Sequence, residues 1–121
     1  MRDYRNTPAY QLTRSLMASV YEVTARLDLA GEGSGPALAL RRAAIGAAAS
    51  LVQGSALASP ADYRRHLGTA RAALSEFPRQ VNLCQLRGQL TPQAARALLA
   101  EQAEASAALG TLIEEAKALA S

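Results

Sequence analysis

The chain has 121 residues, of which 50% are hydrophobic and 4% aromatic, and it carries a formal net charge of +3. This hydrophobic content excludes a disordered chain, and the length predicts one domain spanning residues 1–121 with a core of Leu, Val, Ile and Ala. The single cysteine, Cys84, excludes an intrachain disulfide.

Four prolines each follow a residue suited to helix capping and so mark four helix starts. Proline fits the first turn of a helix because its missing N–H has no intrahelical partner there, and a preceding Ser or Thr can accept a bond from a first-turn amide. The pairs are Thr7-Pro8, Gly35-Pro36 (after Ser34), Ser59-Pro60 and Thr91-Pro92. They predict helices over 8–28, 36–55, 60–87 and 92–120, and therefore an all-α, up-down antiparallel four-helix bundle.

The first two predicted helices differ in how much of their surface is apolar. The first has an apolar face at helical spacing, formed by Leu12, Leu16, Val20, Val23 and Leu27, and a second face beside it, formed by Tyr10, Met17 and Tyr21. A glycine-rich connector at 31–35 follows. The second helix is apolar on most sides beyond Arg42, so we expect a partner subunit to cover part of it.

The last two predicted helices carry the apolar repeat of left-handed bundle packing. In the third, the repeat is Tyr63, Leu67, Ala70, Leu74, Phe77, Val81 and Cys84. In the fourth, it is Leu98, Gln102, Ala105, Leu109, Leu112, Ala116 and Leu119. Gly88 should end the third helix in a left-handed cap, whereas Pro78 should kink or break it. Gln102 either fixes the register of the fourth helix or turns outward.

Candidate catalytic and metal-binding residues are scarce. His66 and Cys84 would lie ~27 Å apart along one continuous helix, too far for a catalytic dyad, and they supply too few ligands for zinc. Asp62 is spaced to pair with His66 in a structural contact and could complete a capping box with Ser59. We therefore expect no enzymatic activity, no cofactor and no metal site.

Three features indicate a cytoplasmic protein without a membrane partner. The first ten residues combine three charges with no apolar run, so we expect no secretory signal. The longest apolar stretch, residues 43–52, falls well short of the ~20 residues that span a bilayer. One unpaired cysteine suits a reducing compartment.

Arginines are concentrated in the second and third predicted helices, whereas acids prevail in the fourth. They predict binding to the phosphate backbone of RNA or DNA, largely independent of sequence because few aromatics are available for base stacking. The candidate contacts are Arg41, Arg42, Arg64, Arg65, Arg71, Arg79 and Arg87. Two alternatives remain open: the arginines keep the bundle in solution, or they pair with acids of another subunit or protein in a scaffold that binds no nucleic acid.

Several motifs, taken in order, resemble one family. They are Leu40-Arg41-Arg42-Ala43-Ala44-Ile45, the run to Gly54, Tyr63-Arg64-Arg65-His66-Leu67 with Ala70, Leu74-Ser75-Glu76, and Leu86-Arg87-Gly88-Gln89-Leu90-Thr91. The order is similar to that of the four-helix-bundle proteins encoded by intervening sequences of large-subunit ribosomal RNA genes. These are related to the accessory variability determinant (Avd) proteins of diversity-generating retroelements. Where the family commonly has Pro, Asn and Glu in its second helix, this chain has Ala48, Ser50 and Gln53, and Pro78 replaces a common Glu.

The resemblance implies a bacterial homopentamer of four-helix bundles without enzymatic activity. For the retroelement branch it further implies binding to a reverse transcriptase and its template RNA. The apolar second helix agrees with oligomerisation, and the arginine-rich helices agree with binding to RNA.

Overall fold

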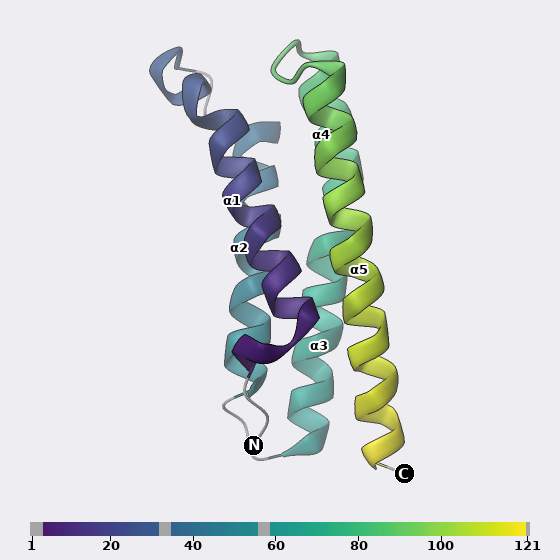
Figure 1. The fold of residues 1–121 in the computed structure, drawn as a ribbon. Helices are drawn as coiled ribbons and strands as arrows, with labels where there is room; N and C mark the ends of the chain where they lie inside the picture. The colour runs from purple at the N-terminus through teal and green to yellow at the C-terminus, as the bar shows by residue number, and fades with distance from the viewer. Residues whose placement is uncertain (1–3, 32–34, 56–58, 121) are drawn as a thin grey trace.

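The computed structural model describes residues 4–31, 35–55 and 59–120, and every element within these ranges is helical (Figure 1). A short 3-10 helix, η1, precedes the five α-helices. The bounds are η1 Tyr4–Asn6, α1 Pro8–Leu29, α2 Pro36–Ser55, α3 Pro60–Ser75, α4 Phe77–Leu86 and α5 Pro92–Ala120. The middle of the predicted connector, residues 32–34, and the capping residue Ser34 within it lie outside the described residues.

The helices pack as an antiparallel bundle with four corners. Helix α1 contacts α2 and α5, and the pair α3 and α4 fills the fourth corner, because both of them contact α2 and α5. Successive corners run in alternate directions along the bundle (Figure 1). The predicted all-α four-helix architecture is confirmed. No helix among the described residues has both the length and the apolar character that a membrane crossing requires.

Three of the predicted helix starts have the side-chain cap that their sequences indicate. The hydroxyl oxygens of Thr7, Ser59 and Thr91 accept bonds from the amides three residues later, at 3.3, 3.3 and 3.1 Å. Each bond satisfies an amide that has no partner inside its helix. The predicted capping box at Ser59 is therefore half formed, since the carboxylate of Asp62 instead pairs with Arg65 at 3.3 Å.

The end of α4 is a Schellman motif centred on Gly88. Its φ is +72°, its amide donates to the carbonyl of Gln85 at 3.0 Å, and the amide of Gln89 donates to the carbonyl of Cys84 at 2.9 Å. The left-handed cap that the sequence predicts is confirmed. It turns the chain toward α5, which begins at Pro92.

The predicted helix over 60–87 is interrupted at Glu76, which separates α3 from α4. Pro78 causes the interruption because it has no N–H to donate to the carbonyl of Leu74. Gln102 of α5 supplies a replacement: its Nε2 donates to that carbonyl at 3.0 Å and to Oγ of Ser106, also at 3.0 Å. Gln102 thus points inward, which settles the alternative left open by the sequence.

The predicted apolar repeats form the core, with one exception. Leu67, Leu74, Phe77 and Val81 have no exposed surface. The remaining fully or almost fully covered members of the two repeats are Ala70, Cys84, Leu98, Ala105 and Leu109. Leu119 was expected in this core but is 76% exposed. The last turn of α5 extends past the first turn of α1, so no α1 residue covers it (Figure 1).

Candidate nucleic-acid interface

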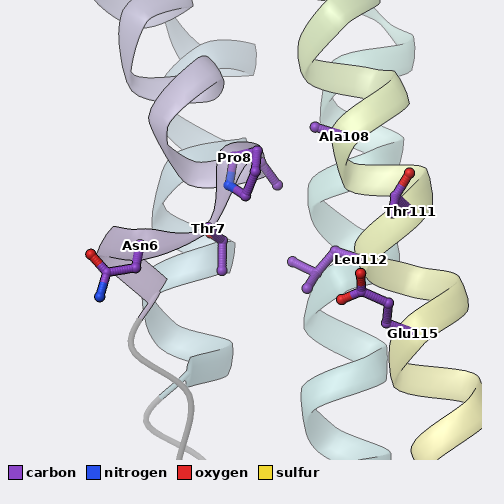
Figure 2. A pocket seen from close by; sticks show the side chains of 8 residues that line it. Asn6, Thr7, Pro8, Ala108, Thr111, Leu112 and Glu115 are labelled. Atoms are coloured by element: carbon purple, nitrogen blue, oxygen red, sulfur yellow. The ribbon is translucent and has the colours of Figure 1, made fainter.

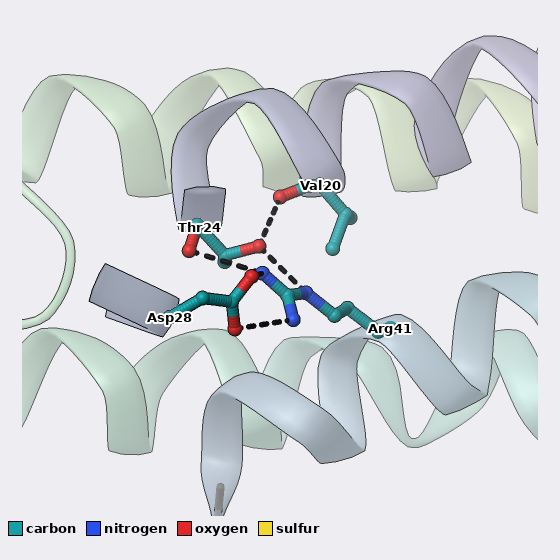
Figure 3. A network of polar contacts seen from close by, with 4 residues as sticks. All are labelled: Val20, Thr24, Asp28 and Arg41. Atoms are coloured by element: carbon teal, nitrogen blue, oxygen red, sulfur yellow. Dashed lines mark hydrogen bonds and ion pairs between the residues drawn. The ribbon is translucent and has the colours of Figure 1, made fainter. Parts of the chain in front are cut away.

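Arg41 of α2 lies inside the bundle, where α1 supplies its partners (Figure 3). Its Nη1 and Nη2 donate to the two carboxylate oxygens of Asp28 at 2.9 and 3.0 Å. Its Nε donates to Oγ1 of Thr24 at 2.9 Å, and Nη2 also donates to the carbonyl of Thr24 at 3.0 Å. The guanidinium stacks 5.0 Å from the ring centre of Tyr21. Only one of its five N–H groups is left without a named acceptor.

This network alters the titration of both charged partners. The hydrogen bonds that Asp28 accepts from Arg41 hold the pKa of the Asp28 carboxyl below its usual value. Desolvation of the carboxyl has a smaller, opposing effect. The bond to Asp28 likewise raises the pKa of Arg41. A bidentate pair of this kind fixes geometry as well as charge, so it locks the rotation of α2 against α1.

Arg41 therefore differs from the other arginines that the sequence groups with it. Adjacent residues on a helix point about 100° apart, so Arg41 and Arg42 cannot both face inward. Arg42 is exposed, whereas the donors of Arg41 are occupied inside the protein. We leave Arg41 out of the interface proposed below.

Five of the candidate arginines are exposed and make no ion pair within the described ranges; they are Arg42, Arg64, Arg71, Arg79 and Arg87. Arg64 and Arg71 are seven residues apart on α3, which places them on one side of the helix and ~10 Å apart along its axis. Arg79 continues the exposed basic surface onto α4, beyond the interruption.

Arg65 is also exposed, but its Nη2 forms an ion pair with Oδ1 of Asp62 at 3.3 Å. Both side chains are at least half exposed, so water and salt screen this pair and it holds Arg65 weakly. Within the described residues the carboxylate of Asp62 pairs with Arg65, three residues later on α3, and the predicted contact between Asp62 and His66 is not formed. Arg65 remains available to an anion.

Arg42 and Arg87 lie near the start of α2. Arg42 lines a groove between α2 and the α3–α4 joint, together with Leu38, Glu76 and Gln80. The Nη1 of Arg87 is near enough to Gly35 that a Cβ added there would lie 3.3 Å from it. The basic surface thus extends from α3 and α4 to the adjoining edge of α2.

The opposite side of the bundle, formed by α1 and α5, has a different character. Its acidic residues are Asp28, which pairs with Arg41, and Glu22, Glu101, Glu104, Glu114 and Glu115. Glu101 accepts a bond from Oγ of Ser19 on α1 at 3.0 Å. Acidic residues outnumber basic ones on α1 and α5, whereas arginines outnumber acids on α2, α3 and α4, and this balance would direct an anionic partner to α2, α3 and α4.

A cleft on the α1–α5 side is a candidate for a small-molecule site. Figure 2 shows Leu112 and Glu115 of α5 facing Thr7 and Pro8 at the start of α1. Among the described residues that line it, Glu115 is the one ionisable group, and none is His or Cys. The arrangement offers no nucleophile with an adjacent base.

The two residues considered for nucleophilic or metal chemistry are held apart. Cys84 is fully covered in the core, and burial raises the pKa of its thiol. His66 packs on α3 beside Gly54 of α2. Within the part of the chain that the structure describes, no group of three or more His, Cys, Asp or Glu side chains converges in a way that could hold a metal ion.

Sequence reasoning missed Asp28 and left the role of Gln102 open between two alternatives. A signal for Asp28 was available, since an acid in the last turn of α1 lies opposite a basic residue early in α2 when a short connector joins them. The signal for Gln102 was Pro78, because a proline inside a helix leaves a carbonyl that needs another donor.

Comparison with known proteins identifies the family. A search of curated proteins finds no match. The sequence pattern of the family described as 23S rRNA-intervening sequence protein matches residues 5–111, which include η1 to α4 and most of α5. Because the match covers most of the chain, the protein belongs to the 23S rRNA-intervening sequence protein family.

Proposed function

We propose that this protein is a non-enzymatic, cytoplasmic RNA-binding accessory factor whose exposed arginines on α2, α3 and α4 contact the phosphate backbone. The observation that carries the proposal is a group of exposed arginines on the α2–α4 side of the bundle that have no ion-pair partner among the described residues: Arg42, Arg64, Arg71, Arg79 and Arg87. The description of the family, which refers to an intervening sequence of 23S rRNA, favours RNA over DNA as the first ligand to test.

Contacts of this kind would depend little on base sequence. The aromatic residues of α2, α3 and α4 within the described ranges are Tyr63, which is partly buried, and Phe77, which is fully buried. Neither offers a free ring on which a base could stack. Guanidinium groups that contact phosphates position a nucleic acid without reading its bases.

The proposal includes assembly into a homopentamer, as the family resemblance implies. Two exposed apolar side chains on the neighbouring helices α1 and α2 support self-association: Tyr21 is 43% exposed and Ile45 is 41% exposed. Large apolar groups on neighbouring helices gain stability when a second copy covers them. Light scattering should give the mass of five chains, and the mass of one chain at micromolar concentration would contradict self-association.

The proposal also includes a reverse transcriptase as protein partner, again on the resemblance to the Avd branch. The test is co-purification of the tagged protein with a reverse transcriptase, with and without nuclease. Retention after nuclease treatment would support direct contact between the two proteins, and loss of the partner would indicate that RNA alone joins them.

Binding of RNA is tested by fluorescence anisotropy of labelled RNA across a salt series. Binding should weaken steeply with salt, and the slope of log K against log [salt] reports the number of phosphates neutralised. Changing Arg64→Gln and Arg71→Gln together should lower the magnitude of the slope by about 1.5 to 2 and weaken binding to every sequence similarly.

The matched control carries Arg14→Gln and Arg96→Gln, two exposed arginines on α1 and α5. It loses the same charge and should keep most of the slope. An equal effect of both pairs would indicate attraction by net charge alone. No binding at any salt concentration would overturn the proposal and favour a scaffold that contacts only proteins.

A further inference from the structure

The joint between α3 and α4 lacks the hydrogen bond that normally continues a helix. Pro78 has no N–H for the carbonyl of Leu74, and the side chain of Glu76 does not cap the first turn of α4. The first backbone bond of α4, from the amide of Gln80 to the carbonyl of the cap residue Glu76, is long at 3.3 Å, and the backbone bond from Glu76 back to α3 runs from its amide to the nearby carbonyl of Leu74. The joint is therefore held mainly by contacts from outside the two helices.

Gln102 provides the polar contact at this joint. Its amide is fixed by two acceptors at once, the carbonyl of Leu74 and Oγ of Ser106, each at 3.0 Å. Phe77 provides the apolar contact, since it is fully buried directly after the interruption. Glu76 keeps nearly helical angles (φ −77°, ψ −17°), so α4 continues in the same corner of the bundle as α3.

We propose that Gln102 is a positioning residue for the phosphate-binding surface, an inference that rests on the function proposed above. Arg71 lies five residues before Glu76 and Arg79 lies three residues after it, so their relative placement is set at the joint. The hydrogen bonds of Gln102 go to Leu74 and Ser106, and neither of them involves Arg71 or Arg79. It acts by holding the end of α3 so that both arginines meet the same phosphate backbone.

The stability that the hydrogen bond from Gln102 to the carbonyl of Leu74 contributes should depend on the presence of Pro78. Gln102→Leu keeps a side chain of similar size and removes one donor, which leaves the carbonyl of Leu74 with only the amide of its near neighbour Glu76. Pro78→Ala restores the backbone N–H that bonds to this carbonyl in an uninterrupted helix. In the Pro78→Ala background, Gln102→Leu should therefore lower the urea midpoint much less than it does in the unaltered chain.

The binding readout separates positioning from stability. The measurement is made at a temperature where the unaltered protein and Gln102→Leu are both folded. Gln102→Leu should then reduce the magnitude of the slope of log K against log [salt] by about one, as expected when Arg71 or Arg79 no longer contacts the phosphate backbone of the RNA. The double variant, Pro78→Ala with Gln102→Leu, should recover the slope. Neither change alters the net charge, so a change of slope cannot come from charge.

Two results would overturn the inference. One is an equal loss of urea midpoint in both backgrounds, which would mean that Gln102 does not replace the missing proline N–H. The other is an unchanged salt slope in folded Gln102→Leu, which would leave Gln102 with a structural role alone. If the unaltered protein binds no RNA, the proposed function fails and the positioning role fails with it, while the unfolding experiment still measures the coupling between positions 78 and 102.

Discussion

Replacing Gly54 with alanine tests how closely α2 and α3 pack. A Cβ added at Gly54 would lie 2.9 Å from the Cβ of His66 and 3.4 Å from Cδ1 of Tyr63. Carbon atoms in favourable contact are about 3.5–4.0 Å apart. The Cβ of His66 is fixed to its backbone and cannot rotate away, so α3 itself must shift to admit the methyl group.

Two effects of this substitution oppose each other. Alanine favours a helix over glycine by up to about 1 kcal/mol, and less near a helix end such as Ser55. Forcing a methyl group into a packed contact costs about 1–3 kcal/mol. We expect the packing cost to exceed the gain by about 1 kcal/mol, which lowers the Tm of a chain of this length by about 4 °C.

Gly46→Ala is the matched control, since it makes the same change in the same helix. Its added Cβ would lie 4.0 Å from the Cβ of Ala73, an ordinary contact. This variant should therefore gain helix stability and raise the Tm. Thermal unfolding followed by circular dichroism, at one fixed protein concentration, compares the two variants. A rise in Tm for both would refute the close approach of the helices at Gly54.

Three further predictions concern separate features of the fold. Because Arg41 holds the pKa of Asp28 low, the pair stabilises the protein at pH values above the unfolded pKa of Asp28, and this stability is lost as the pH falls through the folded pKa. Asp28→Asn should therefore make the urea midpoint fall less steeply at acidic pH than it does in the unaltered chain. An unchanged fall at acidic pH would contradict the ion pair. Gly88→Ala places an L-residue at φ +72° and should destabilise the protein by about 1–2 kcal/mol in urea unfolding, whereas no loss would exclude the left-handed cap. The thiol of Cys84, buried and with its pKa raised, should react with a thiol reagent far more slowly in the folded protein than in urea; equal rates would place it at the surface.

The positions of the helices could be predicted from the sequence because local chemistry determines them. Pro8, Pro36, Pro60 and Pro92 each begin a helix, as the capping pairs predict. Gly88 follows the last turn of α4, as its backbone freedom predicts. These signals depend on residues a few positions apart, so no knowledge of the packed bundle is needed to read them.

The roles of single polar residues could not be predicted, because they depend on how the helices rotate against each other. Arg41 and Arg42 are neighbours in the sequence, yet Asp28 and Thr24 of α1 draw only Arg41 inward. Gln102 occupies an apolar repeat position and could point either way until Leu74 is placed beside it. Such assignments require contacts between residues that are far apart in the chain.

The division between one internal arginine and several external ones is tested most directly by NMR of the arginine side chains. The Nε–H signals of Arg64, Arg71 and Arg79 should shift when RNA is added, because their guanidinium groups are exposed. The signal of Arg41 should stay in place, because its Nε already donates to Thr24 inside the bundle. A shift of the Arg41 signal with no change in the three exposed arginines would contradict this account.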